Sequence, residues 1–316
     1  MSTIEDPIQR AYQTFQDELI EAGLLIPMGV PGLYARSGLF ESVVEQFEKF
    51  VTAMAAERKS EVIWFPPVFN RRHYLCTDHI ETFPNLMGSV HSFTGKDREH
   101  LELIRKRKSE EDWTRDLNAT EVMLLPAACY PLYPTATGVL PEEGRTVDLR
   151  SFVFRHEPSI DPARLQSFRM HEYVRLGTPE QALEHREYWL QRAEEILRAI
   201  GLDVTPVLAN DPFFGRGARM MAATQQEQNL KFEMVVPVAT AEKPTAVASC
   251  NYHLNHFGHS FGIRTADGNE AHSACVGFGL ERVALALFRA RAEGVLDLDL
   301  EPVPVKRNDA RGGSDE

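Results

Sequence analysis

The segment FRHEPSIDPARLQSFRMHEYV, residues 154–174, brings arginines, glutamates and aromatic rings together. If it forms two strands joined by a loop, side chains two apart share a face, so Arg155 and Glu157 point together. An arginine fork can hold a phosphate, and a carboxylate can accept a hydrogen bond from an exocyclic amine. Phe168 adds a ring that can stack on a base. One interpretation of the segment is therefore a nucleotide site.

The same residues have a second interpretation, a cross-strand ladder of ion pairs on a solvated sheet face, and such ladders are the commoner case. The charge of the chain bears on the first interpretation. With 34 Lys and Arg against 46 Asp and Glu, the formal net charge is -12. A polynucleotide surface needs clustered basic residues. Any phosphate ligand is therefore expected to be small.

Helices and strands must position these residues. Apolar residues three and four apart predict a long helix over 39–58, and further helices are predicted over 96–108 and 185–200 and after Gly279. Strands grouped between helices, without strict alternation, indicate an α+β fold, an antiparallel or mixed sheet flanked by helices. The predicted strands are 61–67, which we expect to be buried, 122–130, 147–157, 165–174, 230–239, 245–254 and 259–265.

The chain of 316 residues is predicted to form a single domain over residues 1–301, in which 1–38 are a short N-terminal extension. Residues 302–316 are predicted to be a flexible tail. No apolar run approaches the roughly 18 residues of a membrane helix, and the N-terminus lacks a signal pattern. We therefore expect no membrane association and a cytoplasmic location.

Two stretches of the chain resemble class II aminoacyl-tRNA synthetases. The first is motif 2, with the pattern FRxE, loop, RxxxFxxxE, whose fixed positions are Phe154, Arg155, Glu157, Arg164, Phe168 and Glu172. The second is motif 3, in GFGLERVALALF, whose fixed positions are Gly277, Gly279, Glu281 and Arg282. The helix before EVIWFPP is similar to the dimer-forming motif 1, and residues 230–263 are similar to a seryl-tRNA synthetase segment. The resemblance covers roughly residues 38–295.

This resemblance implies an ATP site. Arg155 would hold the α-phosphate and the substrate carboxylate, and Arg164 and Arg282 would hold the terminal phosphates. Phe168 would stack on adenine, and Glu157 would accept a hydrogen bond from the adenine amine. Further implied ATP contacts are Leu165, Lys231, Ala246, Val247, Ala248 and Ser249. Mg²⁺ is expected with ATP, but Ala246 stands where seryl-tRNA synthetases have a glutamate that helps to hold it.

The four cysteines form no CxxC pair and are too scattered for a disulfide framework, so each is a free thiol or a metal ligand. Atypical, archaeal-type seryl-tRNA synthetases hold a zinc ion that captures the amino group of the substrate. The resemblance implies that Cys129, Glu172 and Cys275 hold Zn²⁺ here, with the fourth position open. Cys76 and Cys250 lack such a context and are predicted to pack in the interior. The remaining candidates, which we expect to make local hydrogen bonds, are His253, His256 and His259.

Residues 1–38 carry more acidic than basic residues, whereas a tRNA-binding arm needs a basic surface. Truncated homologues of atypical seryl-tRNA synthetases are the amino acid:[carrier protein] ligases, which this chain resembles. They activate a small amino acid, with glycine favoured and alanine next, and pass it to the phosphopantetheine thiol of a carrier protein. A homodimer is implied and no tRNA is expected. The alternatives are a truncated seryl-type tRNA synthetase and a non-catalytic, amino-acid-sensing paralogue.

Two basic clusters are candidates for the carrier-protein dock, because carrier proteins are acidic. Arg216 and Arg219 lie beside a Met pair in residues 211–229, for which an amphipathic surface helix is the alternative interpretation. The sequence RKRK at 105–108 is the competing dock, and a solvated helix face also explains it.

Overall fold

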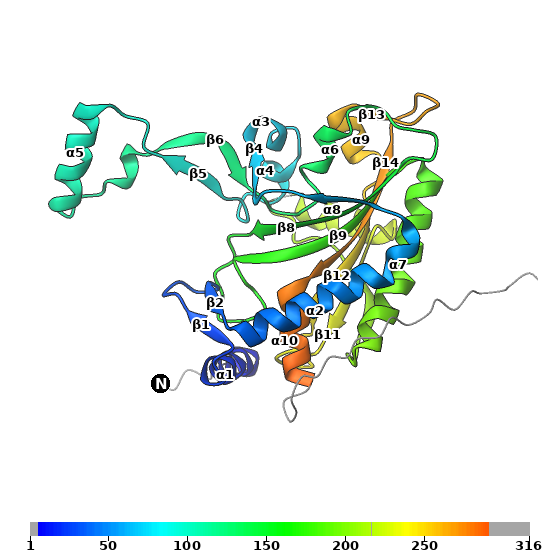
Figure 1. The fold of residues 1–316 in the computed structure, drawn as a ribbon, viewed down its shortest axis with the longest axis horizontal. Coiled ribbons are helices and arrows are strands. Elements are labelled where there is room, and N and C mark those ends of the chain that lie inside the picture. The colour runs from blue at the N-terminus through cyan, green and yellow to red at the C-terminus, as the bar shows by residue number, and fades with distance from the viewer. Residues whose placement is uncertain (1–5, 216, 291–316) are drawn as a thin grey trace, which may run out of the picture.

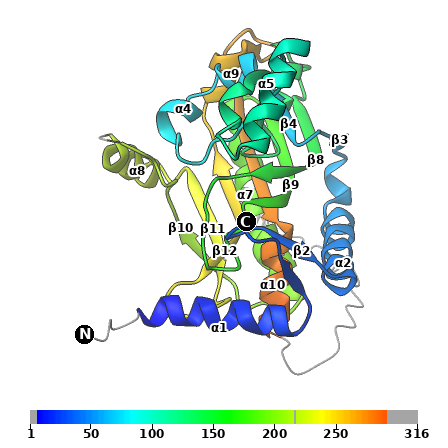
Figure 2. The same cartoon turned by 90° about the vertical axis from the view of Figure 1, so that its left-hand side faces the viewer.

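The computed structural model describes residues 6–215 and 217–290. Within them, seven strands form one sheet, whose neighbours are antiparallel except for the parallel pair β8 and β3 at one edge. Figures 1 and 2 show this sheet with helices packed against it, so the predicted α+β fold is confirmed. In spatial order its strands are β10 (Thr205–Leu208), β11 (Lys231–Val236), β12 (Thr245–Tyr252), β14 (His272–Gly279), β9 (Ser167–Gly177), β8 (Arg145–Phe154) and β3 (Glu61–Trp64).

Three long helices pack on the sheet: α2 (Gly38–Met54), α7 (Pro179–Ala199) and α10 (Leu280–Ala290). In α2 the apolar residues recur at helical spacing and are buried, which confirms the first predicted helix. The helix α7 begins six residues earlier than predicted. Its start was readable, because Thr178 and Gln181 form a capping box and a proline occupies the first turn.

The side chains of β9 and β14 alternate between the helices and the opposite face of the sheet. Trp189 of α7 stacks on Tyr173 of β9 with ring centroids 4.6 Å apart and meets Phe278 of β14 at 6.2 Å. Glu172 and Gly277 precede these two rings and are register partners, so they face away from α7. This alternation separates an aromatic core from a polar face.

Two strand predictions need correction. The segment 61–67 is not a buried strand, because β3 is the edge of the sheet and Val62 and Trp64 are 58% and 66% exposed. After β3 the chain enters a second sheet. In the segment 259–265, residues 259–261 are the end of helix α9 (His256–Phe261), and only Ile263–Arg264 form a strand, β13; the two are separated by Gly262 in the left-handed conformation with φ 63°.

An arm extends from the body of the molecule (Figure 1). It consists of β5 (Ser89–Ser92), α5 (Asp97–Lys108) and β6 (Asn118–Leu124). The predicted helix is present, but it buries none of its residues. Within RKRK, Arg105 pairs with two glutamates and Lys106 pairs with Asp116. The strand predicted over 122–130 is β6, which ends at Leu124.

The N-terminal part begins with α1 (Pro7–Glu21) and a hairpin of β1 (Leu25–Pro27) and β2 (Tyr34–Arg36). One hydrophobic core runs from Tyr12 to Leu287. No helix in the described ranges is long and apolar enough to span a membrane. The predicted tail, 302–316, lies outside the described residues. The short elements are α3 (Arg71–Tyr74), β4 (Val68–Asn70), α4 (His79–Thr82), α6 (Leu132–Thr135), β7 (Gly138–Val139), α8 (Ala218–Glu227) and β13 (Ile263–Arg264).

Candidate active site

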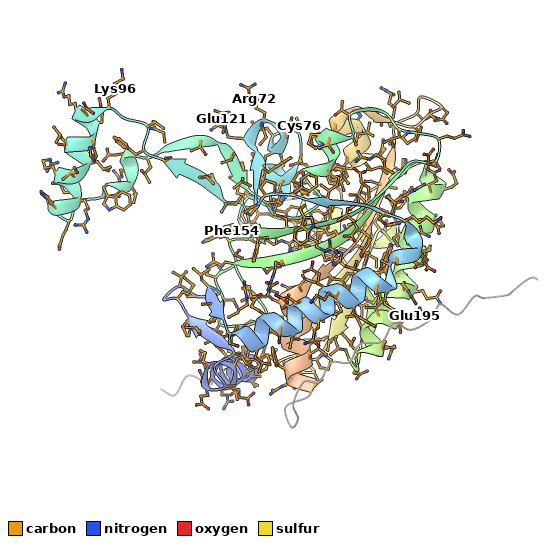
Figure 3. The ribbon with its side chains drawn as sticks, in the orientation of Figure 1. Arg72, Cys76, Lys96, Glu121, Phe154 and Glu195 are labelled. Carbon is orange, nitrogen blue, oxygen red and sulfur yellow. The ribbon has the colours of Figure 1, made fainter. Side chains whose placement is uncertain are left out.

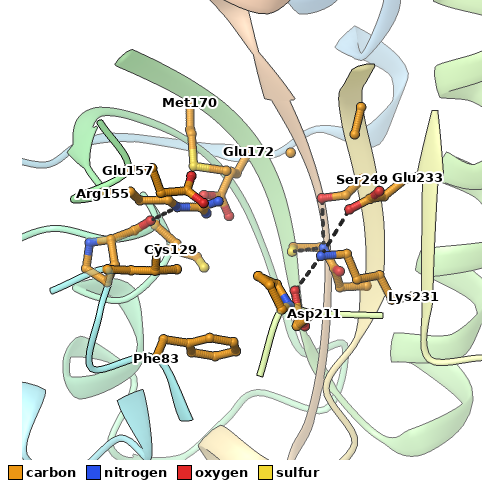
Figure 4. Close-up of a pocket in the computed structure, with 18 of the residues that line it drawn as sticks. Phe83, Cys129, Arg155, Glu157, Met170, Glu172, Asp211, Lys231, Glu233 and Ser249 are labelled. Carbon is orange, nitrogen blue, oxygen red and sulfur yellow. Dashed lines mark hydrogen bonds and ion pairs between the residues drawn. The ribbon is translucent and has the colours of Figure 1, made fainter. Parts of the chain in front are cut away.

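A cavity of about 550 Å³ opens on the polar face of the sheet. Figure 4 shows Arg155 and Glu157 on one side of it and Lys231 and Asp211 on the other. The predicted site residues that line the cavity are Cys129, Arg155, Glu157, Arg164, Glu172, Lys231, Ala246, Ser249, Cys275 and Arg282. The predicted site residues that are instead buried beside it are Leu165, Phe168, Val247 and Ala248.

The first arginine of motif 2 is not on a strand. Because β8 ends at Phe154, Arg155 and Glu157 lie in the loop that follows, and the prediction that they share a strand face is wrong. The Arg155 Nε donates to the carbonyl oxygen of Pro126 at 3.0 Å. Glu157 Oε1 accepts from Arg164 Nη1 at 3.1 Å, so these two side chains are held together by an ion pair within the loop.

Arg282, at the start of α10, connects the motif 2 loop to β12. Its Nε donates to the carbonyl oxygen of Ala163 at 2.8 Å and its Nη1 to that of Ala246 at 3.0 Å. Burial, followed by the nearby charges of Arg155 and Arg164, lowers the pKa of Arg282 to about 10. Three cations therefore converge on this end of the cavity. Such a cluster can bind a polyanion.

Phe168 lies against this arginine cluster. Its ring centroid is 5.7 Å from the guanidinium carbon of Arg155 and 5.9 Å from that of Arg282. Cation–π attraction therefore contributes to the position of both arginines. The side chain is only 6% exposed, so a base could stack on this ring only after a guanidinium moves aside.

Lys231, at the start of β11, projects into the opposite side of the cavity (Figure 4). It forms ion pairs with Asp211 and, at 3.3 Å, with Glu233. Burial alone would lower the pKa of Lys231, but the attraction of Asp211 and Glu233 outweighs it and the pKa is raised. A second hydrogen bond joins Asp211 Oδ2 to Gln225 of α8 at 2.8 Å. The cation is thus balanced by two carboxylates.

The two thiols and the carboxylate predicted to bind zinc come together. Cys129 interacts with Cys275 and Glu172, and Glu172 Oε1 accepts from the backbone N–H of Ala128 at 2.8 Å. Burial, and then the charge of Cys275, raises the pKa of Glu172 to about 8. The interaction with Cys129 lowers the pKa of the Cys275 thiol.

The Cys129, Glu172 and Cys275 side chains therefore interact with one another. Across residues 6–215 and 217–290, no group of three or more His, Cys, Asp or Glu side chains is arranged as a metal site. Two thiolates and a carboxylate are nevertheless a donor set that suits Zn²⁺, so the residues fit the ion by their chemistry.

Two residues beside Cys275 were missed as site residues. Asn251 Nδ2 and His253 Nε2 each lie 3.5 Å from its sulfur, and both line the cavity. A signal was available for Asn251, because Ser249 and Asn251 are two residues apart on β12 and share a strand face, and His253 follows directly after the strand. The histidine also meets Ser273 at 3.0 Å. Local hydrogen bonding, as predicted, therefore describes only part of its surroundings.

Of the other two histidines of the predicted cluster, His259 makes the expected local contact, 2.8 Å from Glu270. His256 instead lies 3.3 Å from Asp78, which is distant in the sequence, and lines the cavity. Among the remaining cysteines, Cys250 is buried as predicted, whereas Cys76 is exposed and the prediction that it packs in the interior is wrong. Figure 3 labels Cys76 near the outside of the molecule, in the turn that follows α3.

No family model matches the chain. "Amino acid--[acyl-carrier-protein] ligase 1" of Bradyrhizobium diazoefficiens is 42% identical over 287 residues, which are 90% of this chain and 86% of that protein. "Amino acid--[acyl-carrier-protein] ligase 2" of the same organism is 43% identical over 292 residues, which are 92% of this chain and 86% of that protein.

Among solved structures, M. kandleri SerRS in complex with A. aeolicus tRNASec has a TM-score of 0.74 at 18% identity, with 87% of this chain and 56% of that chain covered. This structural likeness shows the class II synthetase fold. The identity and coverage of the two ligases show that the chain belongs to the amino acid:[acyl-carrier-protein] ligase family.

Proposed function

We propose that this protein activates a small amino acid with ATP and transfers it to the phosphopantetheine thiol of an acyl carrier protein. The observation that carries the proposal is the content of one cavity. Its Arg155, Arg164 and Arg282 form a cation cluster, and its Cys129, Glu172 and Cys275 form a buried thiol–carboxylate set. The first set suits a triphosphate, and the second suits an amino group bound through zinc.

In the activation step, the carboxylate of the amino acid attacks the α-phosphate of ATP and pyrophosphate leaves. Arg155 holds the carboxylate and the α-phosphate, and Arg164 and Arg282 hold the terminal phosphates. Arg164 is free to take this role only when its ion pair with Glu157 opens, which also frees the Glu157 carboxylate for the adenine amine. Phe168 packs against the base once a guanidinium has moved.

The remaining ATP contacts are assigned by the same resemblance. Lys231 contacts the nucleotide from the far side of the cavity, and the backbone of residues 246–249 lines the site together with Leu165. Mg²⁺ accompanies ATP. Its coordination differs from that in seryl-tRNA synthetases, because Ala246 has no carboxylate to offer.

Zinc, when bound by Cys129, Glu172 and Cys275, supplies a Lewis acid for the amino group of the substrate. The protein groups around it orient the ligands. The Ala128 N–H fixes one oxygen of Glu172, and an amide and an imidazole lie against the Cys275 sulfur. Glycine, and then alanine, is the substrate that the family resemblance favours for this set.

In the transfer step, the pantetheine thiol attacks the carbonyl carbon of the aminoacyl adenylate. A thioester forms, AMP leaves and the thiol proton passes to a phosphate oxygen of AMP. We place the carrier protein on α8, because this helix exposes Arg219 and Met220 and is tied to the cavity through Gln225. Arg216, the other predicted residue of this dock, lies outside the described residues.

We also propose that the protein is a homodimer and that residues 1–301 act as one catalytic domain. Support for the dimer comes from β3, an edge strand that carries the exposed Val62 and Trp64. Unpaired edge strands with large apolar side chains are normally covered by a partner. A second copy of the chain, pairing through this edge, provides that cover.

One competition experiment tests the function. The protein is given ATP, a mixture of amino acids, holo-carrier protein and tRNA together, and the products are weighed by mass spectrometry. A glycyl or alanyl thioester on the carrier protein is expected. An ester on tRNA would replace the proposal with a truncated tRNA synthetase. Failure to exchange pyrophosphate into ATP with any amino acid would point to a non-catalytic paralogue.

A further inference from the structure

The loop that carries Arg155, Glu157 and Arg164 has no regular secondary structure over most of its length. Irregular loops hold functional side chains in place only where other elements brace them. Beyond Arg282, this loop is braced by the N-terminal hairpin of β1 and β2. Figure 1 shows α1, β1 and β2 together at one end of the molecule.

Backbone hydrogen bonds connect the hairpin turn to the loop. The N–H of Gln166, the residue before β9, donates to the carbonyl oxygen of Gly32 at 2.8 Å. The side-chain Nε2 of Gln166 donates to the carbonyl oxygen of Pro31 at 2.8 Å. On its other side, Gln166 accepts from the N–H of Arg155 at 2.9 Å. The turn, Gln166 and Arg155 thus form one continuous chain of contacts.

The contact is closest at Gly32. A Cβ atom at this position would lie 2.9 Å from the carbonyl oxygen of Arg164 and 3.3 Å from Cγ of Gln166. The backbone of Gly32 is also left-handed, with φ 75°. Gly29, in the same turn, has φ 78° but its Cβ would meet nothing within 4 Å. The two glycines therefore share the same backbone requirement, and only Gly32 also requires a close approach to the loop.

The helix α1 makes further contacts to the same loop. Tyr12 is buried and lines the cavity together with Asp161 and Arg164. Gln16 Nε2 donates to the carbonyl oxygen of Ile160 at 3.3 Å. The middle and the C-terminal end of the loop are therefore in contact with residues 7–36.

We propose that the N-terminal helix and hairpin, residues 7–36, are a built part of the ATP site, in which Gly32 and Gln166 are positioning residues for Arg155 and Arg164. This inference rests on the proposed function, because it assigns to ATP the ligand of those arginines. A purely structural extension would change stability alone. A positioning element changes the KM for ATP while leaving the KM for the amino acid, which binds at the thiol set, nearly unchanged.

The test compares Gly32→Ala with Gly29→Ala in the full chain. Both variants carry the same left-handed strain, and only the first pushes on the carbonyl of Arg164. In ATP–pyrophosphate exchange, we expect Gly32→Ala to raise the KM for ATP roughly tenfold over Gly29→Ala, with the KM for the amino acid within about twofold. Equal KM values for ATP in the two folded variants would overturn the proposal.

A second variant covers the case in which Gly32→Ala does not fold. Gln166→Met keeps the length of the side chain but removes its donor to Pro31, and an increase of about threefold in the KM for ATP is expected. An unchanged KM in this variant would overturn the proposal.

Amide hydrogen exchange of residues 155–166 gives a readout that needs no ATP. Exchange should be faster in Gly32→Ala, or in Gln166→Met, than in Gly29→Ala. If exchange speeds up but the wild-type protein does not activate any amino acid, the contact between residues 7–36 and the loop is supported and the proposed function is wrong. If the wild-type protein is active and loop protection is the same in all variants, the positioning role of residues 7–36 is wrong.

Discussion

Arg169 of β9 and the Glu281 carboxylate of α10 are joined by two hydrogen bonds, one from the guanidinium and one from the backbone of Arg169. Arg169 Nε donates to Glu281 Oε1 at 2.8 Å and the backbone N–H of Arg169 donates to Oε2 at 2.7 Å. The Glu281 side chain has 0% exposure. This contact joins the strand that carries Glu172 to the helix that carries Arg282. The two motifs are therefore held in register by residues outside the cavity.

Replacing Glu281 with Gln should destabilise the protein. The variant leaves the Arg169 cation with Glu41, at 2.7 Å, as its one remaining ionic partner among residues 6–215 and 217–290. Breaking a buried ion pair costs about 3 kcal/mol in the free energy of unfolding. The matched control is Glu184→Gln, whose pair with Arg58 is exposed and is worth about 0–1 kcal/mol. Urea unfolding of both variants measures the difference, and equal losses would contradict this prediction.

Substitution of Cys275 by Ala should remove bound zinc and amino-acid activation together. The loss of activity should exceed the roughly 10–100-fold cost of altering an outer partner of a metal site, because a ligand itself is removed. Metal content by mass spectrometry and ATP–pyrophosphate exchange check the two effects. Cys250→Ala, another buried cysteine, is the control and should retain both zinc and activity. Wild-type activation by a zinc-free Cys275→Ala protein would refute the zinc assignment.

Acid should weaken the fold partly through His185. This side chain is fully buried, its Nε2 lies 3.1 Å from the carbonyl oxygen of Tyr173, and burial lowers its pKa from 6.5 to about 3. Above pH 6.5 the His185 imidazole is neutral in both the folded and the unfolded state, so its contribution to the free energy of unfolding is fully present. Between pH 6.5 and 3 the unfolded chain takes up a proton that the folded protein refuses, so stability falls by up to about 1.4 kcal/mol per pH unit.

His185→Gln keeps a donor for the carbonyl of Tyr173 and cannot be protonated. The free energy of unfolding of this variant should therefore depend less steeply on pH between 6.5 and 3, although it is lower at pH 7. The exposed His91→Gln is the control and should follow the wild-type curve. Parallel curves for all three proteins in denaturant titrations would rule out this role of His185.

Trp64→Glu should convert the proposed dimer to monomers. The side chain is 66% exposed at the edge strand β3, so a carboxylate there would repel its symmetry mate and hinder pairing of the edges. Sedimentation equilibrium should show at least a tenfold weaker association, or about 1.4 kcal/mol. The control is Val139→Glu on β7, which is similarly exposed but lies in another sheet. A dimer that persists unchanged in Trp64→Glu would place the interface elsewhere.

Charge reversal at Arg216 and Arg219 should slow transfer to the carrier protein while adenylation stays intact. Loss of cationic contacts to an acidic partner should lower kcat/KM for transfer by about tenfold and reduce its dependence on salt. Reversal of Arg107 and Lys108 on α5 is the control, because RKRK is the competing dock. If only the α5 variant slows transfer, the dock belongs to the arm. Unchanged transfer in the α8 variant would exclude α8.

Much of the site followed from local patterns. The alternation along β9 correctly separates Glu172, in the cavity, from His171, which instead meets Asp148 at 2.9 Å in the interior. The alternation succeeds because side-chain direction within one strand depends on neighbouring residues alone. The resemblance to motifs 2 and 3 implies one site for Arg155 and Arg282, and both line the cavity.

Other features depended on where an element sits. EVIWFPP is apolar enough to be buried, yet β3 occupies the edge of the sheet and Trp64 is exposed. Cys76 is exposed for a similar reason, since it lies in a surface turn after α3. The composition of a segment does not state which elements flank it, so its burial could not be read from the segment.

The sequence alone determined the α+β fold, the resemblance to class II synthetases and ten of the residues that line the cavity, since periodicity and motif spacing are properties of short stretches. Only the tertiary structure decided that Phe168 lies against two guanidinium groups, that His253 reaches Cys275 and that Gly32 supports the loop of Arg164. Gly32 lies near the N-terminus and Arg164 in the motif 2 loop, so the two residues are far apart in the sequence. Contacts of this kind arise from the packing of the whole chain, because the free energy that selects them is shared among many distant residues.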